Sequence, residues 1–278
     1  GCVVVFRDVT HERDVDKVKT EFISIASHQL RTPLTAIKLF GEMLLNDEVG
    51  KLAPKQRDYV TDMYESTERM VRLVNDLLNI SRLETGRLKV TPQPIKLEDL
   101  IQDIIDEEAA VAKARNCVVK FKHPSKPLPT IPLDQTLMRQ VIHNLFTNGL
   151  KYSKPGSGQV TIELTTTNTS SAAKALVAQA LKKEPAALLP YVLIAVTDDG
   201  LGIPAAAQKR IFEKFFRADN AIKMQAEGSG LGLYVSKMII EAMGGKIWFV
   251  SNENKGSVFY VAFPQSGAVP KAGERSLA

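Results

Sequence analysis

A histidine, a threonine and a proline lie within two turns of a predicted helix near the start of the 278-residue chain, in the run Ser-His-Gln-Leu-Arg-Thr-Pro-Leu. Pro33 removes one backbone hydrogen bond and clashes with the carbonyl of Gln29, at a cost of about 3 kcal/mol. We therefore expect a bend that the protein uses. Thr32 follows His28 by four residues and lies on the same helical face. A lone helical histidine is more often structural, but these neighbours make His28 a candidate for chemistry.

A second candidate is a polar stripe on a helix that is otherwise apolar. Asn144, Asn148 and Lys151 are spaced four and three residues apart, so they share one helical face. Amide oxygens suit Mg²⁺, which prefers oxygen ligands and keeps several waters, and a lysine on the same face can meet phosphate. The same pattern is also typical of a solvated helix face.

Two glycine-rich strings complete the candidates. Residues 198–204 (Asp-Asp-Gly-Leu-Gly-Ile-Pro) follow a strand that the pattern predicts to be buried. Glycine lets the backbone approach a ligand, and a carboxylate accepts hydrogen bonds from an amino group, although Asp-Gly also marks ordinary turns. Residues 228–233 (Gly-Ser-Gly-Leu-Gly-Leu) open a helix, where backbone N–H groups bind phosphate. A Rossmann site is excluded, because it needs a preceding strand and another glycine spacing.

The elements around His28 are two long helices, predicted at about 11–46 and 55–84 from apolar residues three and four apart. Gly50 and Pro54 lie between them and Gly86 ends the second. Two such helices with a short loop form an antiparallel hairpin. One hairpin cannot bury both wide apolar stripes, so the pattern predicts that two chains form a four-helix bundle.

After residue 86 helices and strands are mixed, which predicts an α+β fold, a sandwich with helices packed on one face of a sheet. The expected helices lie at 97–115, 133–151 and 231–243, and the expected strands at 88–90, 118–122, 159–165, 191–197, 247–251 and 257–263. Residues 170–190, rich in Ala, Lys and Leu, are interpreted as an insertion with a short surface helix. Residues 1–10 are predicted to form a strand, and residues 266–278 a flexible tail.

The length and composition are typical of a globular protein without a membrane span or a disulfide framework. The length suits two domains, and 44% apolar with 24% charged residues is typical of a globular chain. No apolar run approaches the roughly 20 residues of a membrane span, and no signal peptide is expected. Cys2 and Cys117 cannot form a disulfide framework, which fits a reducing compartment. The net charge of +5 is diffuse, so we expect no nucleic-acid partner. We also expect this segment to be cytoplasmic, with any anchor in the inner (plasma) membrane elsewhere in a longer protein.

Together these strings resemble one family, the sensor histidine kinases of two-component systems, over about residues 11–264. The run around His28 resembles the phosphoacceptor box, residues 144–152 the N box and residues 198–203 the first glycine box. Residues 212–217 (Phe-Glu-Lys-Phe-Phe-Arg) are similar to the F box and residues 228–233 to the second glycine box. Residues 1–10 resemble the last strand of a PAS module.

The resemblance implies a HisKA-type dimerisation and phosphotransfer domain over 11–86 and a GHKL-type (Bergerat) ATP-binding domain over 87–265. It implies ATP-dependent phosphorylation of His28, then transfer to an aspartate of a separate response regulator. The family usually has an acidic residue after this histidine, whereas this chain has Gln29. An amide can orient the ring but cannot stabilise an imidazolium by charge, so no general base is assigned. Thr32 corresponds to the position that orients water during dephosphorylation of the regulator.

For the nucleotide, the resemblance makes Asn148 the Mg²⁺ ligand and places Asn144 and Lys151 near the phosphates of ATP. It places Tyr152 beside the adenine, and Asp198 on the adenine amino group.

The two glycine boxes imply that the backbone can approach the nucleotide closely, and together with the F box they imply a mobile lid. The glycine-box positions are Gly200, Gly202, Gly228, Gly230, Leu231 and Gly232. Gly228, Gly230 and Gly232 border a mobile lid at about 218–227. Lys214 and Arg217 resemble cations near the lid that stabilise the transferring phosphate.

Two alternatives stay open. One is another ATPase of the same nucleotide-binding fold, which would lack the upstream His-x-x-Arg-Thr-Pro hairpin. The other is a dimeric signalling scaffold in which Gln29 has disabled autophosphorylation, against which the intact magnesium and lid residues argue.

Overall fold

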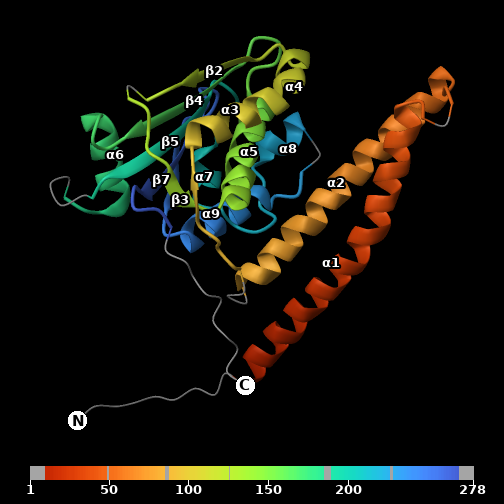
Figure 1. Ribbon diagram of the computed structural model, residues 1–278, viewed down its shortest axis with the longest axis horizontal. Coiled ribbons are helices and arrows are strands. Elements are labelled where there is room, and N and C mark those ends of the chain that lie inside the picture. The colour runs from red at the N-terminus through yellow and green to blue at the C-terminus, as the bar shows by residue number, and fades with distance from the viewer. Residues whose placement is uncertain are drawn as a thin grey trace. The chain divides into compact units, whose positions relative to one another are not determined.

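The computed structural model describes residues 10–48, 50–84, 88–124, 126–184, 189–225 and 228–268, without the side chains of residues 10–25, 27–28, 79 and 82–84. The chain divides into two compact units, Gly1–Leu88 and Lys89–Ala278. The first unit contains a pair of long helices, and the second contains strands and shorter helices (Figure 1). The strand predicted at residues 1–10 lies outside the described residues.

The first unit is the predicted helical hairpin. Helix α1 spans Thr10–Leu45 and continues through Pro33, and α2 spans Pro54–Glu84. Proline suits the first position of α2, where its missing N–H has no helical partner to lose. Between the helices, Leu34 from α1 packs with Val74 and Leu78 from α2. Apolar residues at helical spacing therefore pack the two helices against each other.

The second unit is built on a five-stranded sheet of order β2-β4-β5-β7-β6, in which β2 and β4 are parallel and the other neighbours antiparallel. Its strands are β2 (Val118–Lys122), β4 (Gln159–Thr166), β5 (Tyr191–Asp198), β6 (Lys246–Ser251) and β7 (Ser257–Pro264). A separate antiparallel ribbon pairs β1 (Gln93–Ile95) with β3 (Ile131–Leu133). The strand predicted at 88–90 is wrong, because the apolar residue Val90 is buried there without strand pairing.

The helices of this unit are α3 (Leu97–Glu107), α4 (Ala109–Ala114), α5 (Gln135–Tyr152), α6 (Ser171–Leu181), α7 (Ala205–Gln208), α8 (Asp219–Met224) and α9 (Gly232–Ala242). The helix predicted over 97–115 is interrupted at Glu108, where φ is −94° and ψ is 5°. The helix predicted to begin at Leu133 begins instead after Asp134. The Asp134 carboxylate caps α5 by accepting a 3.1 Å hydrogen bond from the Leu137 N–H, and Leu133 belongs to β3.

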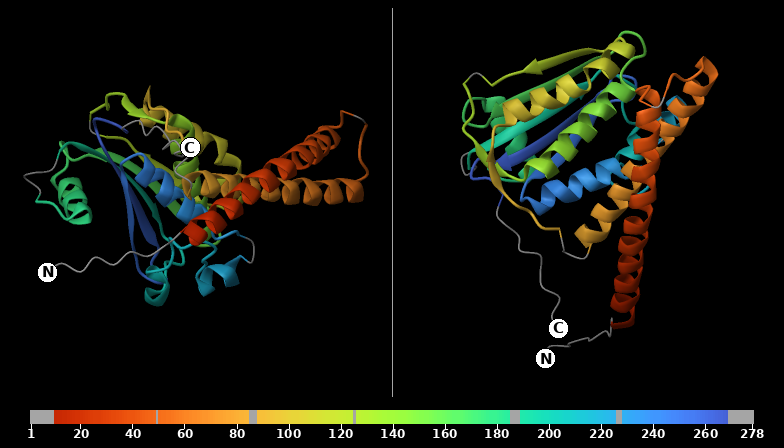
Figure 2. Two further views of the ribbon diagram at one scale, coloured as in Figure 1. Left: turned by 90° about the horizontal axis from the view of Figure 1, so that it is seen from below. Right: turned by 45° about the vertical axis from the view of Figure 1, so that its right-hand side comes forward.

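Helices α3, α5 and α9 lie together over one face of the sheet (Figures 1 and 2). Helix α5 buries a broad stripe that comprises Met138, Val141, Ile142, Leu145 and Phe146. Every second residue of β5, namely Val192, Ile194 and Val196, is also buried. These side chains form the main core, which holds the polar stripe of α5 at its edge.

Helix α6 covers part of the opposite sheet face, so the prediction of helices on one face only is incomplete. Val177 of α6 is fully buried and packs in one cluster with Tyr191, Leu193 and Ala262 of the strands. Beside them Trp248 and Tyr260 stack with ring centroids 5.2 Å apart. The residues interpreted as a surface insertion therefore contain a helix that completes a second small core.

The tail predicted from residue 266 differs from the structure at its start. The Ala268 N–H donates a 2.8 Å hydrogen bond to the Pro132 carbonyl, and Ala268 is buried. Residues 269–278 lie outside the described part of the chain. Among the helices that the structure describes, none combines the length and apolar character needed to cross a membrane.

Candidate functional site

The polar stripe of α5 is a connected pair of amides. Asn144 donates through Nδ2 to the hydroxyl of Ser236 on α9 at 2.9 Å. Asn148, one turn later on α5, donates through Nδ2 to the carboxamide oxygen of Asn144 at 3.3 Å. The two asparagines that the sequence places on one helical face therefore touch, and a side chain from a distant helix holds the first.

The glycines of the second glycine box bring α9 against α5 and the 212–217 segment. A Cβ at Gly232 would overlap the carboxamide oxygen of Asn144. Gly230, with φ of +68°, approaches the backbone of Phe215, where a Cβ would lie 2.6 Å from the carbonyl carbon. Leu231 between them is fully buried. These glycines make room for the protein's own groups, a role that their motif did not indicate.

The cationic groups of Lys151 and Arg217 both lie near Gly228, at the start of the second glycine box. A Cβ at Gly228 would lie 3.3 Å from Nζ of Lys151 and 3.2 Å from Cζ of Arg217. Arg217 also donates hydrogen bonds to the carbonyls of Ala221, Gln225 and Gly228. The structure thus assigns the Arg217 guanidinium to the backbone of α8 and the segment after it, beside Lys151.

Lys214, the other predicted cation of the F box, lies against α9. Its Nζ is 5.3 Å from the ring centroid of Tyr234, a distance at which an aromatic face attracts a cation. The F box therefore contributes one cation bound to lid carbonyls and one bound to α9.

Asp198 is the last residue of β5. Its Oδ1 accepts a 2.9 Å hydrogen bond from the Gly200 N–H. Burial raises the pKa of Asp198 to about 6, partly offset by backbone N–H groups of Gly200 and Ser257. The loop packs on the C-terminus of α5, since Leu201 N donates to the Tyr152 carbonyl at 3.1 Å and a Cβ at Gly200 would overlap that oxygen.

The predicted lid, 218–227, contains helix α8 rather than only loop, and residues 226–227 lie outside the described chain. Gly202 has φ of +59°, where glycine is favoured, and packs on the Asn252 carbonyl. Its own carbonyl accepts a 3.0 Å hydrogen bond from Nδ2 of Asn220 on α8. Asn220 therefore links α8 to the first glycine box. Arg217, which precedes α8, binds carbonyls of that helix and of the residue after it.

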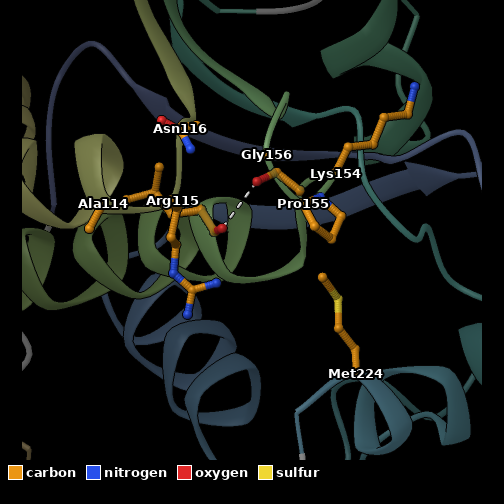
Figure 3. Close-up of a pocket in the computed structure, with 9 residues that line it drawn as sticks. Ala114, Arg115, Asn116, Lys154, Pro155, Gly156 and Met224 are labelled. Atoms are coloured by element: carbon orange, nitrogen blue, oxygen red, sulfur yellow. Dashed lines mark hydrogen bonds between the residues drawn. The ribbon is translucent and has the colours of Figure 1, made fainter.

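A hollow of about 260 Å³ opens beside the C-terminus of α5 (Figure 3). Its lining comprises Ala114, Arg115, Asn116, Leu150, Ser153, Lys154, Pro155, Gly156 and Met224. Figure 3 shows the Met224 side chain of α8 pointing toward Pro155. Arg115 reaches the Lys151 carbonyl at 3.4 Å, so the hollow adjoins the N box without containing its asparagines.

In the first unit, residue 28 belongs to α1, but the side chain of His28 lies outside those described. Gln29 and Thr32 are both exposed on this helix. Arg31 donates a 2.8 Å hydrogen bond to Asn75 of α2. The neighbours of the predicted phosphoacceptor are thus accessible.

Sequence reasoning missed Ser236 and Asn220. Ser236 had a weak signal, a polar residue four positions after Gly232 in an apolar helix, whereas nothing in the sequence singles out Asn220.

Comparison with known proteins identifies both units. Residues 18–86 match the family described as His Kinase A (phospho-acceptor) domain, and residues 133–267 match the family of histidine kinase-, DNA gyrase B- and HSP90-like ATPases. The chain belongs to the sensor histidine kinases. The second unit of this sensor histidine kinase therefore carries the family's ATP-binding domain, preceded by its phosphoacceptor domain.

Among its relatives, the kinase is 33% identical over 266 residues to sensor protein kinase WalK of Staphylococcus saprophyticus, covering 95% of this chain and 39% of WalK. It is 30% identical over 262 residues to sensor protein GacS of Pseudomonas syringae, covering 94% of this chain and 26% of GacS. The chain thus spans less than half the length of these relatives.

Solved structures share the fold of this chain. Full-length ShkA in complex with AMPPNP is 27% identical, with a TM-score of 0.64 over 92% of this chain and 47% of ShkA. The Acinetobacter baumannii histidine kinase AdeS, 20% identical, has a TM-score of 0.54 over 86% of this chain and 98% of AdeS, and shares the fold.

Proposed function

We propose that this chain transfers the γ-phosphoryl group of ATP to His28, and that the group then passes to an aspartate of a separate response regulator. The observation that carries the proposal is the convergence of the boxes. The asparagine pair of α5, the Asp198 loop and the Arg217-bound lid meet around α5. A phosphoacceptor domain precedes this unit in the chain, which favours a histidine kinase over other ATPases of the same fold.

For the nucleotide, we assign the adenine to the side of Asp198 and Tyr152. With a pKa of about 6, the Asp198 carboxyl is mostly ionised at neutral pH, so it can accept a hydrogen bond from the adenine amino group. Lys151 and Arg217, which meet near Gly228, suit the negative charge of the phosphates.

The donor set of the N box fits Mg²⁺. The amino group of Asn148 donates a hydrogen bond to Asn144. The carbonyl oxygen of Asn148 is therefore the end that can bind a cation, and Mg²⁺ prefers such oxygen ligands. When bound, Mg²⁺ would neutralise charge that develops on the β- and γ-phosphates. Asn148 is the residue that we assign to hold it.

The phosphoryl step needs a neutral His28 ring with a free Nε2 lone pair. That lone pair attacks the γ-phosphorus in line, the bond to the bridging oxygen breaks, and ADP leaves with the bonding electrons. Before the attack, the exposed Gln29 amide can hold the tautomer that carries its proton on Nδ1. After the attack, that proton passes to solvent water, which leaves a neutral phosphohistidine ring. In the second step the phosphoryl group moves from Nε2 to a carboxylate oxygen of the regulator.

We also propose that the hairpin dimerises into a four-helix bundle. Large apolar side chains remain exposed on both helices, namely Leu30, Ile37, Leu39, Phe40, Tyr59, Met63, Met70 and Leu73. One hairpin cannot cover them, whereas a second copy would.

Since the reaction consumes ATP, we place this segment in the cytoplasm.

The test is incubation with γ-labelled ATP and Mg²⁺. The wild-type chain should acquire a label that acid removes and alkali does not, and His28→Ala should acquire none. His123→Ala, a matched change at a histidine whose ring centroid lies 4.1 Å from that of Phe121, should label normally. Equal labelling of His28→Ala would refute the phosphoacceptor role.

A wild-type chain that binds Mg·ATP but never labels would instead favour the scaffold, in which Gln29 has disabled the reaction. Asn148→Ala should lose Mg·ATP binding in calorimetry yet stay dimeric in light scattering. Unchanged Mg·ATP affinity would refute the assignment of Asn148, and a monomeric wild type would refute the bundle.

A further inference from the structure

Ser236 is a buried hydroxyl in an apolar setting. It is 2% exposed on α9, and the other buried residues of that helix are Val235, Ile239 and Ile240. Its Oγ accepts the 2.9 Å hydrogen bond from Nδ2 of Asn144. A buried amino group without an acceptor would be costly, so Ser236 satisfies the inner end of the Asn144 amide.

The other end of that amide lies against the start of the same helix. The carboxamide oxygen of Asn144 lies against Gly232, the first residue of α9. Helix N-termini carry partial positive charge and unpaired N–H groups, which favour an oxygen over an amino group there. Gly232 and Ser236 are four residues apart and on one face of α9, so this helix contacts both ends of the amide.

The orientation passes from Asn144 to Asn148. A carboxamide carries an acceptor oxygen and a donor amino group on the same carbon, and they point in different directions. Because the Asn144 oxygen faces Asn148, it accepts from the Asn148 amino group at 3.3 Å. The carbonyl oxygen of Asn148 is consequently the end directed away from this bond. A reversed Asn144 would offer an amino group to Asn148 and would reverse the second amide as well.

We propose that Ser236 is a positioning residue that acts through Asn144 to present the carbonyl oxygen of Asn148 to the divalent cation of a bound nucleotide. This role rests on the proposed function, in which Asn148 meets Mg²⁺. Ser236 itself touches neither nucleotide nor cation. Removing its hydroxyl should leave nucleotide binding possible but weaken the advantage that Mg²⁺ gives.

The experiment is calorimetry of AMPPNP binding to the whole chain, once with Mg²⁺ and once with EDTA. In Ser236→Ala the affinity with Mg²⁺ should fall about threefold to tenfold, the range for one buried hydrogen bond. The affinity in EDTA should stay within about twofold. Ser236→Cys replaces the hydroxyl with a slightly larger thiol, which is a weak acceptor, so it should show the same selective loss.

Two controls separate positioning from general damage. Val235→Ala truncates the neighbouring buried side chain and should change both affinities together or not at all. In an Asn144→Ala background, Ser236→Ala should have no further effect on the Mg²⁺ advantage.

An unchanged Mg²⁺ advantage in both Ser236 variants would overturn the proposal, and so would an equal fall with and without Mg²⁺. A wild-type chain that binds no AMPPNP in either condition would overturn the proposed function instead.

Discussion

Gly232 and Asn144 are in contact so close that the first turn of α9 leaves no space for a β-carbon beside the Asn144 carboxamide oxygen. The second glycine box is therefore tied to the N box by packing, in addition to any contact with phosphate. A change at Gly232 should act on the nucleotide through the asparagine pair.

Gly232→Ala should lower AMPPNP affinity about tenfold or more, because the added methyl displaces a polar pair that is then left unsatisfied. It should also destabilise the second unit by about 1–3 kcal/mol, as overpacking does. Calorimetry and thermal melting measure the two effects. Leu233→Ala, at the next position of α9, serves as the control and should retain affinity; wild-type affinity in Gly232→Ala would show that Asn144 moves freely.

Asp198 should make nucleotide binding depend on pH. Its pKa of about 6 means that the carboxyl becomes protonated as the pH falls below that value and then no longer accepts freely from an amino group. AMPPNP affinity should therefore rise between about pH 5 and pH 7, and Asp198→Asn should bind weakly with a flat profile. A wild-type profile without a step near pH 6 would argue against contact between Asp198 and the base.

The same shift predicts a gain in stability on substitution. The folded chain holds the Asp198 proton more tightly than an unfolded chain, whose aspartate titrates near 3.8. The stability from this group is thus fully present below about pH 4 and is lost as the pH rises through about 6. Relative to wild type, Asp198→Asn should gain about 1–3 kcal/mol between pH 4 and pH 8, measured by denaturant melts. No relative gain would mean that the carboxylate is not desolvated.

Gln29→Glu should raise the rate of autophosphorylation. A carboxylate beside His28 can stabilise the positive ring as Nε2 attacks, and such assistance contributes about 10²-fold or more in enzymes. Only part of this should appear, since the amide can already fix the tautomer. The measurement is the initial rate of labelling by γ-labelled ATP. Slower labelling would make Gln29 a specific adaptation of this chain.

Thr32→Ala provides the contrast on the same helix, because Thr32 is exposed beside Gln29. It should leave labelling of His28 largely intact and slow the dephosphorylation of a regulator. Loss of labelling in Thr32→Ala would place this hydroxyl in the kinase reaction.

Helix α6 should contribute to the stability of the second unit. Val177→Ala removes two methyl groups from a fully buried site against the sheet and should cost about 1–3 kcal/mol. Ala175→Ser, on the exposed face of the same helix, should cost almost nothing. Equal melting temperatures for the two variants would mean that α6 is a surface insertion that adds no stability.

The sequence by itself determined the elements and the motifs whose information is local. Apolar residues three and four apart predicted the hairpin of α1 and α2, and the spacing of Asn144, Asn148 and Lys151 placed them on one face of α5. Periodicity and motif spacing depend only on neighbours along the chain. For the same reason the predicted bounds of the five strands of the main sheet agree with the structure to within one residue.

Only the tertiary structure decided what depends on partners distant in sequence. The pattern could not show that Ser236 holds Asn144, that Gly232 and Gly200 give room to Asn144 and Tyr152, or that Arg217 binds lid carbonyls. It also missed the break at Glu108 and the second core under α6. Side-chain hydrogen bonds and close packing arise where elements meet, and the chain order of the residues does not specify which surfaces meet.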